Sequence, residues 1–366
     1  MKVLFLTLFS PLGGTSRIYV YQFVPLFERA GISCIVRNIY SDRFFKLQMG
    51  LVPAHRIVKK INFFWSSLCG IMKTSWWICG AWRYDVVYIQ KYTMPASLYW
   101  VLRLCNPHVI YGFEDAIYET NPFLPQGRIE SRLIRYQAHL FRNMVRHAVS
   151  VMTENEYLAA EAKKYNPHVF IISFPVNSAR IHPVPRGRSL ETVTVGWIGS
   201  PSTSYLLEGI APVFARLAAR HENVQLKVVG AALDFSMKGI GFIKKEWRLE
   251  EEYADLCSFD IGVMPLDDAP FNRGRLGGKM ILYMSVGIPI VASNLGLNRT
   301  VVRHGIYGFL VNSFDEWVEA LSLLVTNAAL RQRLGDEGRK IAEERFSLER
   351  QADLLVKEIR AAAHSL

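Results

Sequence analysis

Two short apolar runs, each followed by a glycine loop and a helical stretch, limit the folds open to this sequence. The first run is residues 3–9 (VLFLTLF), which leads into Gly13 and Gly14, and the second is residues 193–199 (VTVGWIG). Continuous apolar strands are typical of parallel sheets that helices cover on both faces. The first run is short and no small-residue cleavage site follows it, so it indicates a buried strand in preference to a signal peptide.

Further apolar runs repeat this pattern in both halves of the chain. They lie at residues 33–39, 85–90, 108–113, 148–153, 169–173, 224–230, 260–265 and 289–293. Helical spacing appears between them, at 16–29 and 206–219, and again over 315–363. The alternation predicts two α/β units with right-handed βαβ crossovers, and 366 residues suffice for two domains. The Pro-, Ser- and Arg-rich stretch 175–189 is the expected linker.

Both glycine loops are candidate phosphate-binding loops. The residues concerned are Gly13, Gly14, Gly199, Ser200 and Thr203. Glycines let the backbone approach a ligand, and the free amides of a helix start attract an anion. A tight turn explains the glycines as well, and Ser202 or Thr203 is also suited to cap a helix. Neither loop has the G-x-G-x-x-G or P-loop pattern, so a nicotinamide-binding protein and a P-loop nucleotidase are not supported.

A cluster of cations and glycines gives the strongest signal for an anionic ligand. Directly before the helical residues 280–286 stand Arg273, Arg275, Gly277, Gly278 and Lys279. Positive charge is unfavourable at a helix N-terminus, so we expect an anion to neutralise these cations. A diphosphate is the expected ligand, and a solvated basic loop is the alternative.

Residues 195–346 resemble the family 4 glycosyltransferases. The resemblance rests on VGWIGSPSTSYL, FDIGVMPLDDAPFNRGRLGGKMILYMSVGIPIVASN, GIYGFLVNSFDEWVEAL and LRQRLGDEGRKIAEERFS, and more loosely on GGTSRIYVYQFVPLFERAGI, VIYGFEDAIY and VMTENEYLA. It implies the α/β GT-B fold, in which two Rossmann-like domains face each other across a cleft. We expect an acceptor-binding domain over residues 1–178, a nucleotide-sugar-binding domain over 190–345, and a C-terminal helix, 346–366, that packs back on the first domain.

The resemblance also implies a reaction and a donor. Members of the family are typically retaining transferases of the EC 2.4 class that use a nucleotide sugar as donor, and no metal or other cofactor is expected. They usually carry two glutamates eight residues apart, the second of which contacts the donor ribose. Gly274 and Leu282 stand at those positions here, although a branch of the family resembles this chain in having R-G-[KR] and a lysine instead. Asp267 and Asp268 are candidate substitutes, or they form an acidic loop that faces water.

Glu114 and Asp115 are the candidate catalytic residues. They follow a predicted strand in the sequence GFEDA, and carboxylates at the carboxyl edge of a parallel sheet face the crevice where ligands bind. Either is able to orient or deprotonate an acceptor hydroxyl. The segment resembles an acidic D-x-D-D segment of this branch, with Gly112 in place of its first aspartate. A helix N-cap is the alternative role, and in retaining members the departing phosphate is itself able to take the acceptor proton.

The interval between Asp42 and Asp85 holds no acidic residue and mixes basic with aromatic side chains. Such a mixture suits an anionic bilayer surface, because cations meet headgroups and rings lie at the interface. Lys73 argues against a transmembrane segment over 61–82, and a buried helix hairpin is the alternative. The basic stretch 128–146 extends the same surface. The residues expected at a membrane or acceptor surface are Lys59, Lys60, Phe63, Phe64, Trp65, Trp76 and Trp77.

The formal net charge of +11 calls for negatively charged partners. We expect a nucleotide-sugar donor, a lipid-linked or membrane-proximal acceptor and an anionic membrane surface, and no nucleic acid, since no nucleic-acid-binding motif is present. Five scattered cysteines favour a reducing compartment. These features together predict a cytoplasmic, peripheral membrane enzyme of cell-envelope, exopolysaccharide or lipopolysaccharide synthesis. A nucleotide-sugar epimerase and a catalytically silent sugar- or lipid-binding protein are the alternatives.

Overall fold

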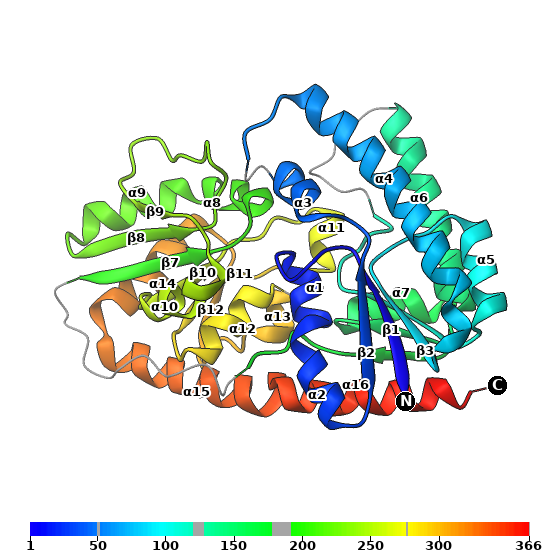
Figure 1. Ribbon diagram of the computed structural model, residues 1–366. Coiled ribbons are helices and arrows are strands. Elements are labelled where there is room, and N and C mark those ends of the chain that lie inside the picture. The colour runs from blue at the N-terminus through cyan, green and yellow to red at the C-terminus, as the bar shows by residue number, and fades with distance from the viewer. Residues whose placement is uncertain (50–51, 120–127, 178–191, 276, 366) are drawn as a thin grey trace. The chain divides into compact units, whose positions relative to one another are not determined.

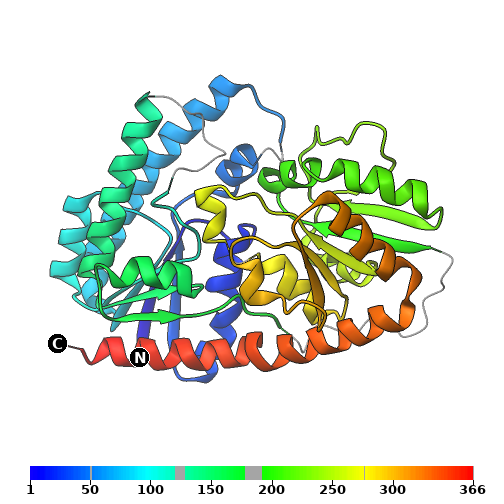
Figure 2. The ribbon, with the colours of Figure 1, turned by 180° about the vertical axis from the view of Figure 1, so that it is seen from behind.

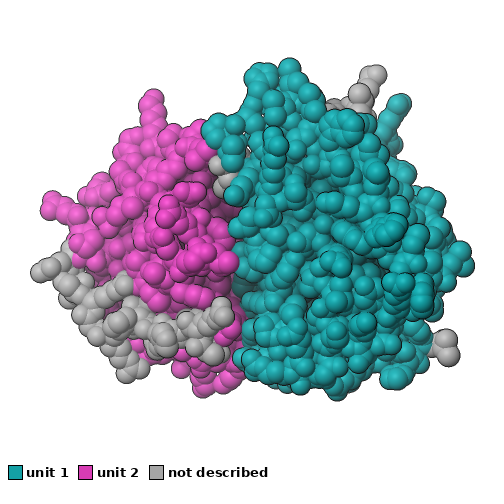
Figure 3. All heavy atoms as spheres, in the orientation of Figure 1, with its two compact units in different colours: residues 1–175, 348–366 teal, residues 176–347 magenta. Residues whose placement is uncertain are grey.

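The computed structural model describes residues 1–49, 52–119, 128–177, 192–275 and 277–365 (Figure 1). The chain divides into two compact units, which Figure 3 shows in different colours. Unit 1 comprises Met1–Pro175 and Leu348–Leu366, and unit 2 comprises Val176–Ser347. Most of the expected linker, residues 178–189, lies outside the described residues.

Unit 1 is built on a parallel six-stranded sheet in the order β2-β1-β3-β4-β5-β6. Its strands are β1 (Lys2–Thr7), β2 (Ser33–Asn38), β3 (Val86–Gln90), β4 (Val109–Phe113), β5 (Ser150–Thr153) and β6 (Val169–Ile171). Each strand overlaps an apolar run of the sequence, and the first run is an internal strand of the sheet. The strands β3, β4 and β5 are buried along their whole length, as expected for a sheet covered on both faces.

The helices of unit 1 surround this sheet. They are α1 (Gly14–Tyr19), α2 (Val24–Arg29), α3 (Asp42–Gln48), α4 (Arg56–Cys79), α5 (Ala96–Cys105), α6 (Arg128–His147), α7 (Glu156–Lys163) and α16 (Leu348–Ala363). The single helix expected over 16–29 is divided by a 3-10 turn, Tyr21–Phe23, after which Pro25 lies in the first turn of α2. The C-terminal helix α16 runs along α2 and the sheet (Figures 1 and 2), and Leu355 and Ile359 are buried in the core of unit 1.

Unit 2 repeats the architecture with a parallel sheet in the order β12-β11-β10-β7-β8-β9. Its strands are β7 (Val193–Ile198), β8 (Val224–Val229), β9 (Ile243–Lys245), β10 (Ile261–Met264), β11 (Ile290–Ser293) and β12 (Gly308–Val311). Sequence analysis missed the two edge strands. β9 (IKK) is three residues long and has two lysines, while β12 is a four-residue strand that begins with glycine.

The helices of unit 2 are short where proline or a polar residue interrupts them. They are α8 (Tyr205–Glu208), α9 (Ala211–Arg220), α10 (Glu252–Cys257), α11 (Pro270–Arg273), α12 (Gly278–Ser285), α13 (Asn298–Val301), α14 (Phe314–Thr326) and α15 (Ala328–Phe346). The helix expected over 206–219 is divided before α9, where Pro212 lies in the first turn. The helical tail is divided at Asn327, which caps α15, and at Ser347.

Candidate active site

Both predicted catalytic carboxylates belong to a charged group at the carboxyl ends of β3 and β4. Lys91 Nζ lies 2.9 Å from Glu114 Oε1 and also binds Asp115 Oδ2. The side-chain amide of Gln90 donates a 2.9 Å hydrogen bond to Glu114 Oε2. Burial raises the pKa of Glu114, although Lys91 acts in the opposite direction. One lysine therefore holds the two carboxylates together.

The backbone of Lys91 is in an unusual conformation. Its φ of +60° lies in the left-handed region, which residues other than glycine rarely adopt. Its N–H donates a 2.7 Å hydrogen bond to the carbonyl of Gly112 on β4. Burial lowers the pKa of the amine, but Asp115 and Glu114 outweigh burial and raise the pKa, so Lys91 stays charged. Backbone strain of this kind is found where a side chain is held for function.

A third carboxylate, the buried Glu154, extends the group. The hydroxyl of Tyr19 on α1 donates a hydrogen bond to Glu154 Oε1. Burial raises the pKa of Glu154 to about 8, with further contributions from Asp115 and Glu114, so the side chain is mostly protonated at neutral pH.

Sequence analysis missed Lys91 and Glu154, although one signal was available. Lys91, Glu114 and Glu154 each stand directly after a strand, and β3, β4 and β5 are neighbours in the sheet. Charged residues that immediately follow adjacent parallel strands meet at one edge. The same rule that found Glu114 was therefore sufficient to find the other two.

The first glycine loop is tied to this group through Ser16. Its Oγ accepts a 3.2 Å hydrogen bond from the Phe9 N–H and donates to Gln90 Oε1 at 3.4 Å. A Cβ at Gly13 would lie 2.6 Å from Phe9 Cβ, whereas the space beside Gly14 is open. Close packing therefore accounts for Gly13, and donor binding by the two glycines stays a prediction.

Lys279 and Gly199 meet at the carboxyl end of β7 in unit 2. Lys279 Nζ lies 4.3 Å from the centroid of the buried Trp197 ring. A Cβ at Gly199 would lie 2.4 Å from that ring and 2.9 Å from Nζ, so only glycine fits there. Lys279 is half-buried, and burial together with the nearby Arg275 lowers its pKa to about 7. An anion at this position would favour the charged form of the lysine.

Arg273 of the predicted cluster is paired with a carboxylate. Arg273 donates hydrogen bonds of 2.9 and 3.1 Å to the exposed Asp268 carboxylate. The guanidinium carbon of Arg275 lies 5.5 Å from the Phe271 ring centroid, and its charge acts on Lys279. Arg275 is therefore the cation whose charge acts on Lys279.

The backbone before α12 requires glycine. Gly277 has a φ of +66°, and a Cβ there would lie 2.9 Å from the Met264 methyl carbon. Gly278 is the first residue of α12, so Lys279 lies in the first helical turn. Leu282, at the position of the family's second glutamate, is half-buried on the same helix.

Ser200 and Thr203 form a capping box around the 3-10 turn Pro201–Thr203. Thr203 Oγ1 accepts a 3.3 Å hydrogen bond from the Ser200 N–H and donates to the Ser200 carbonyl at 3.0 Å. Capping was one of the two roles left open by the sequence. Donor binding by these hydroxyls stays a prediction.

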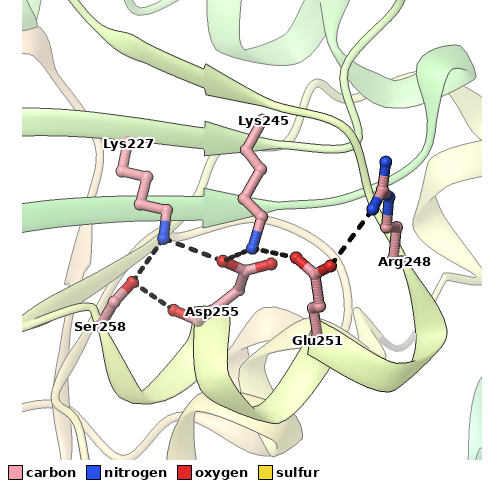
Figure 4. Close-up of polar contacts among 6 residues, drawn as sticks. All are labelled: Lys227, Lys245, Arg248, Glu251, Asp255 and Ser258. Atoms are coloured by element: carbon pink, nitrogen blue, oxygen red, sulfur yellow. Dashed lines mark hydrogen bonds and ion pairs between the residues drawn. The ribbon is translucent and has the colours of Figure 1, made fainter.

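An ion-pair network fixes the neighbouring edge of the sheet (Figure 4). The buried Asp255 of α10 binds Lys227 of β8 at 2.9 Å and Lys245 of β9 at 2.7 Å. Lys245 also binds Glu251 at 2.6 Å, and Glu251 binds Arg248 at 3.5 Å. The network connects both strands to α10 and so positions the turn that follows β9.

Trp247 in this turn lies beside the second glycine loop. Its indole N–H donates a 2.8 Å hydrogen bond to Glu252. A Cβ at Gly230 would lie 3.1 Å from Trp247 Cβ and would also contact the Gly199 carbonyl. The sequence did not single out either residue as part of a site, although Gly230 directly follows β8 in the same way that Gly199 directly follows β7.

The helix α4 exposes a stripe of large apolar side chains. Their spacing of three or four residues puts them on one helix face: Ile57, Ile61, Phe64, Leu68, Met72 and Trp76. Of the other predicted surface residues, Phe63, Trp65 and Lys60 are exposed and Lys59 is half-buried. Trp77 differs from the prediction, because it packs against the core of unit 1. The segment is one helix and not a buried hairpin, and none of the described helices is long and apolar enough to cross a membrane.

Metal-ligating side chains do not converge in the described part of the chain. No three His, Cys, Asp or Glu residues there are placed to hold a metal ion.

Sequence comparison gives a family for unit 2. Residues 192–327 match the family described as "Glycosyl transferases group 1". A stretch of 76 residues is 33% identical to spore coat protein SA of Bacillus subtilis (strain 168). This stretch covers 20% of each protein, so the match spans about a fifth of the length of that curated relative.

Solved structures share the whole fold. Sucrose-phosphate synthase from Thermosynechococcus elongatus has a TM-score of 0.71 at 16% identity, over 98% of each chain. HepE of Anabaena in complex with UDP and glucose has a TM-score of 0.63 at 15% identity, over 99% of this chain and 100% of that one. A glycosyltransferase from Rickettsia africae ESF-5 has a TM-score of 0.66 at 11% identity, over 100% of this chain and 99% of that one.

These comparisons agree with the two parallel sheets of units 1 and 2, and the predicted α/β fold of the GT-B type is confirmed. They are also compatible with the resemblance to family 4. Residues 192–327 therefore match a glycosyltransferase family, and the chain as a whole has the GT-B type of fold.

Proposed function

We propose that this chain transfers a sugar from a nucleoside-diphosphate donor, bound by unit 2, to a lipid-linked or membrane-proximal acceptor, bound by unit 1. The reaction retains the configuration of the sugar, needs no metal, and serves the synthesis of cell-envelope or exported polysaccharide at the cytoplasmic face of a membrane. The observation that carries the proposal is the Lys279 group, in which a half-buried lysine, Arg275 and a glycine loop lie together.

The Lys279 group suits a diphosphate for an electrostatic reason. Lys279 has lost part of its hydration and has a pKa of about 7, so the free protein holds its charge weakly. An anionic phosphate would stabilise that charge, and Arg275 adds a second cation nearby. When the sugar leaves, negative charge grows on the diphosphate, and the two cations and the loop amides would stabilise it without a metal. The HepE structure, solved with UDP and glucose, supports a nucleotide sugar of this kind as donor.

The Lys91 group suits an acceptor hydroxyl. Asp115 is half-buried and Glu114 is buried, and Lys91 holds both in place. Asp115 is the more accessible of the two, so it is the carboxylate that would accept a hydrogen bond from the acceptor. Glu114, bonded to Gln90 and Lys91, would position this pair.

The apolar stripe of α4 suits a membrane surface. Exposed apolar areas of this extent mark interaction sites, and a stripe with rings on one helix face fits the interface of a bilayer. Lys60 and Lys73 are exposed on the same helix, and the segment has no acidic residue to repel anionic lipid. A membrane-bound enzyme meets lipid-linked acceptors directly.

A thermal-shift panel of nucleoside diphosphates and nucleotide sugars tests donor binding. A ligand of the folded state raises the melting temperature, and we expect selectivity for one base. The donor found in this way is then used to measure donor hydrolysis and transfer to membrane extracts. Lys279→Met should abolish both, whereas Lys238→Met, at an exposed position of unit 2, should not. Equal activity of the two variants would contradict the proposal, and conversion of the donor to an epimeric nucleotide sugar would indicate an epimerase.

Vesicle sedimentation tests the membrane surface. The protein should sediment with anionic vesicles at low salt and be released at high salt, because screening weakens the attraction. Replacement of Phe64, Trp65 and Trp76 by serine should abolish sedimentation without lowering the melting temperature, since all three are exposed. A wild-type protein that stays in solution with anionic vesicles at low salt would rule out peripheral attachment.

A further inference from the structure

A pocket of about 450 Å³ in unit 2 is lined by residues other than those of the Lys279 group. It lies where β10, β11 and β12 end, and α8 and the first turn of α14 complete its wall. The carboxyl ends of parallel strands are where α/β proteins bind ligands. The volume equals that of about fifteen water molecules in the liquid, which is more than a single ion needs.

Side-chain amides line one side of this pocket. Asn294 Nδ2 donates a 2.9 Å hydrogen bond to Asn312 Oδ1, and Asn312 Nδ2 donates to Glu316 Oε2 at 3.0 Å. An amide has two N–H donors, so each asparagine keeps one N–H beyond the hydrogen bonds seen among the described residues. Ser293 Oγ accepts a 3.0 Å hydrogen bond from the Leu266 N–H and keeps its own hydroxyl hydrogen to donate.

The wall of the pocket carries one negative and one positive side chain. Among the described residues, its charged lining residues are Asp267 and Arg299, of opposite sign. Asp267 accepts hydrogen bonds from Tyr205 at 3.0 Å and from Asn272 at 2.6 Å. Arg299 donates to the Asn294 side chain at 2.9 Å and to its carbonyl at 2.7 Å. A ligand with a large net charge would therefore gain little here, in contrast to the Lys279 group.

Aromatic rings line another side. Phe314 is the first residue of α14 and directly follows the helix cap Ser313. Its side chain is 46% exposed. Trp317 lies three residues later on the same helix face and also borders the pocket. Aromatic faces attract C–H groups, and amides exchange hydrogen bonds with hydroxyls. A sugar ring presents both kinds of group, since it has C–H faces and a rim of hydroxyls.

We propose that this pocket binds an uncharged sugar residue, with its ring against Phe314 and its hydroxyls on the amides of Asn294 and Asn312. Every group involved belongs to unit 2 and lies outside the Lys279 group, so the proposal does not rest on the transfer reaction. In an enzyme that acts on saccharides, such a pocket would hold a sugar residue of a longer glycan.

Saturation-transfer NMR without nucleotide tests this proposal. The probes are methyl α-D-glucopyranoside, methyl α-D-mannopyranoside and N-acetyl-D-glucosamine, with uridine as a non-sugar comparison. At least one sugar should bind the wild type, and Asn312→Ala or Phe314→Ser should weaken binding about tenfold, as expected for one lost contact. Leu323→Ser is the matched control, because Leu323 is 45% exposed on α14 and does not line the pocket.

Three results would overturn the proposal. They are no binding of any of the three sugars, binding that neither pocket variant changes, and binding of uridine but of no sugar. Lys279→Met separates this site from the donor site. That variant should lose nucleoside-diphosphate binding and keep sugar binding, whereas loss of sugar binding would place the sugar at the donor site.

Discussion

Binding of a nucleoside diphosphate to unit 2 should take up a proton from solution at pH 8. Lys279 has a pKa of about 7, because it is half-buried and Arg275 lies nearby. At pH 8 only about 9% of the protein therefore carries a proton on Lys279. A phosphate beside the amine favours its charged form, and a pKa of about 9 in the complex would raise this fraction to about 90%. The protein should then take up about 0.8 proton for each nucleotide that binds.

Calorimetric titration at pH 8 in buffers of different ionisation enthalpy measures this number directly. The nucleotide contributes little, because the second phosphate pKa lies near 6. At pH 6 Lys279 is already about 90% protonated, so its uptake should fall to about 0.1 proton. Lys279→Met should bind more weakly with almost no uptake at pH 8, while Lys238→Met should match the wild type. Tight binding without proton uptake at pH 8 would refute the proposal that the bound phosphate lies beside Lys279. Equal proton uptake by Lys279→Met and Lys238→Met would refute it as well.

Three further predictions concern the groups around the two sites. Lys91→Met removes the cation that pairs with Glu114 and Asp115, so the free energy of unfolding in urea should fall by about 3–5 kcal/mol, and an unchanged value would show that the pairs do not stabilise the fold. Gly199→Ala would place a methyl group 2.4 Å from the Trp197 ring, so it should cost about 1–3 kcal/mol of stability and weaken nucleotide binding. Gly14→Ala, in open space, is the control for stability, and an equal loss of stability would contradict the close packing at Gly199. The folded-state pKa of Glu154 is about 8 and its unfolded value is about 4.3, so the folded state binds more protons between these values and stability falls as pH rises from 5 to 8. Glu154→Gln should flatten the melting temperature over this range, and an unchanged slope would argue against a raised pKa.

The sequence was sufficient to place the strands other than β9 and β12. Internal strands such as β3 and β4 are buried on both faces, so they read as continuous apolar runs between polar loops. The edge strands β9 and β12 were missed because they are short and are held by pairing with one neighbour. Helix ends were misplaced where Pro25 and Pro212 begin a new helix inside a periodic stretch.

The candidate site was only partly predictable. The position of a residue after a strand was enough to make Glu114 and Asp115 candidates, and a cluster of cations and glycines was enough to make Lys279 one. The pairing of Lys91 with both carboxylates depends on how β3 and β4 lie side by side. The contact of Lys279 with Trp197 joins residues from two strand–loop–helix segments. Such contacts carry no local pattern, because they are set by tertiary packing.

A crystal structure with a bound nucleoside diphosphate tests the central claim most directly. We predict that Lys279 Nζ lies within about 2.7–3.1 Å of a phosphate oxygen, with Arg275 close to the same diphosphate. A diphosphate bound elsewhere, with Lys279 still against the Trp197 ring and far from any phosphate, would contradict the account.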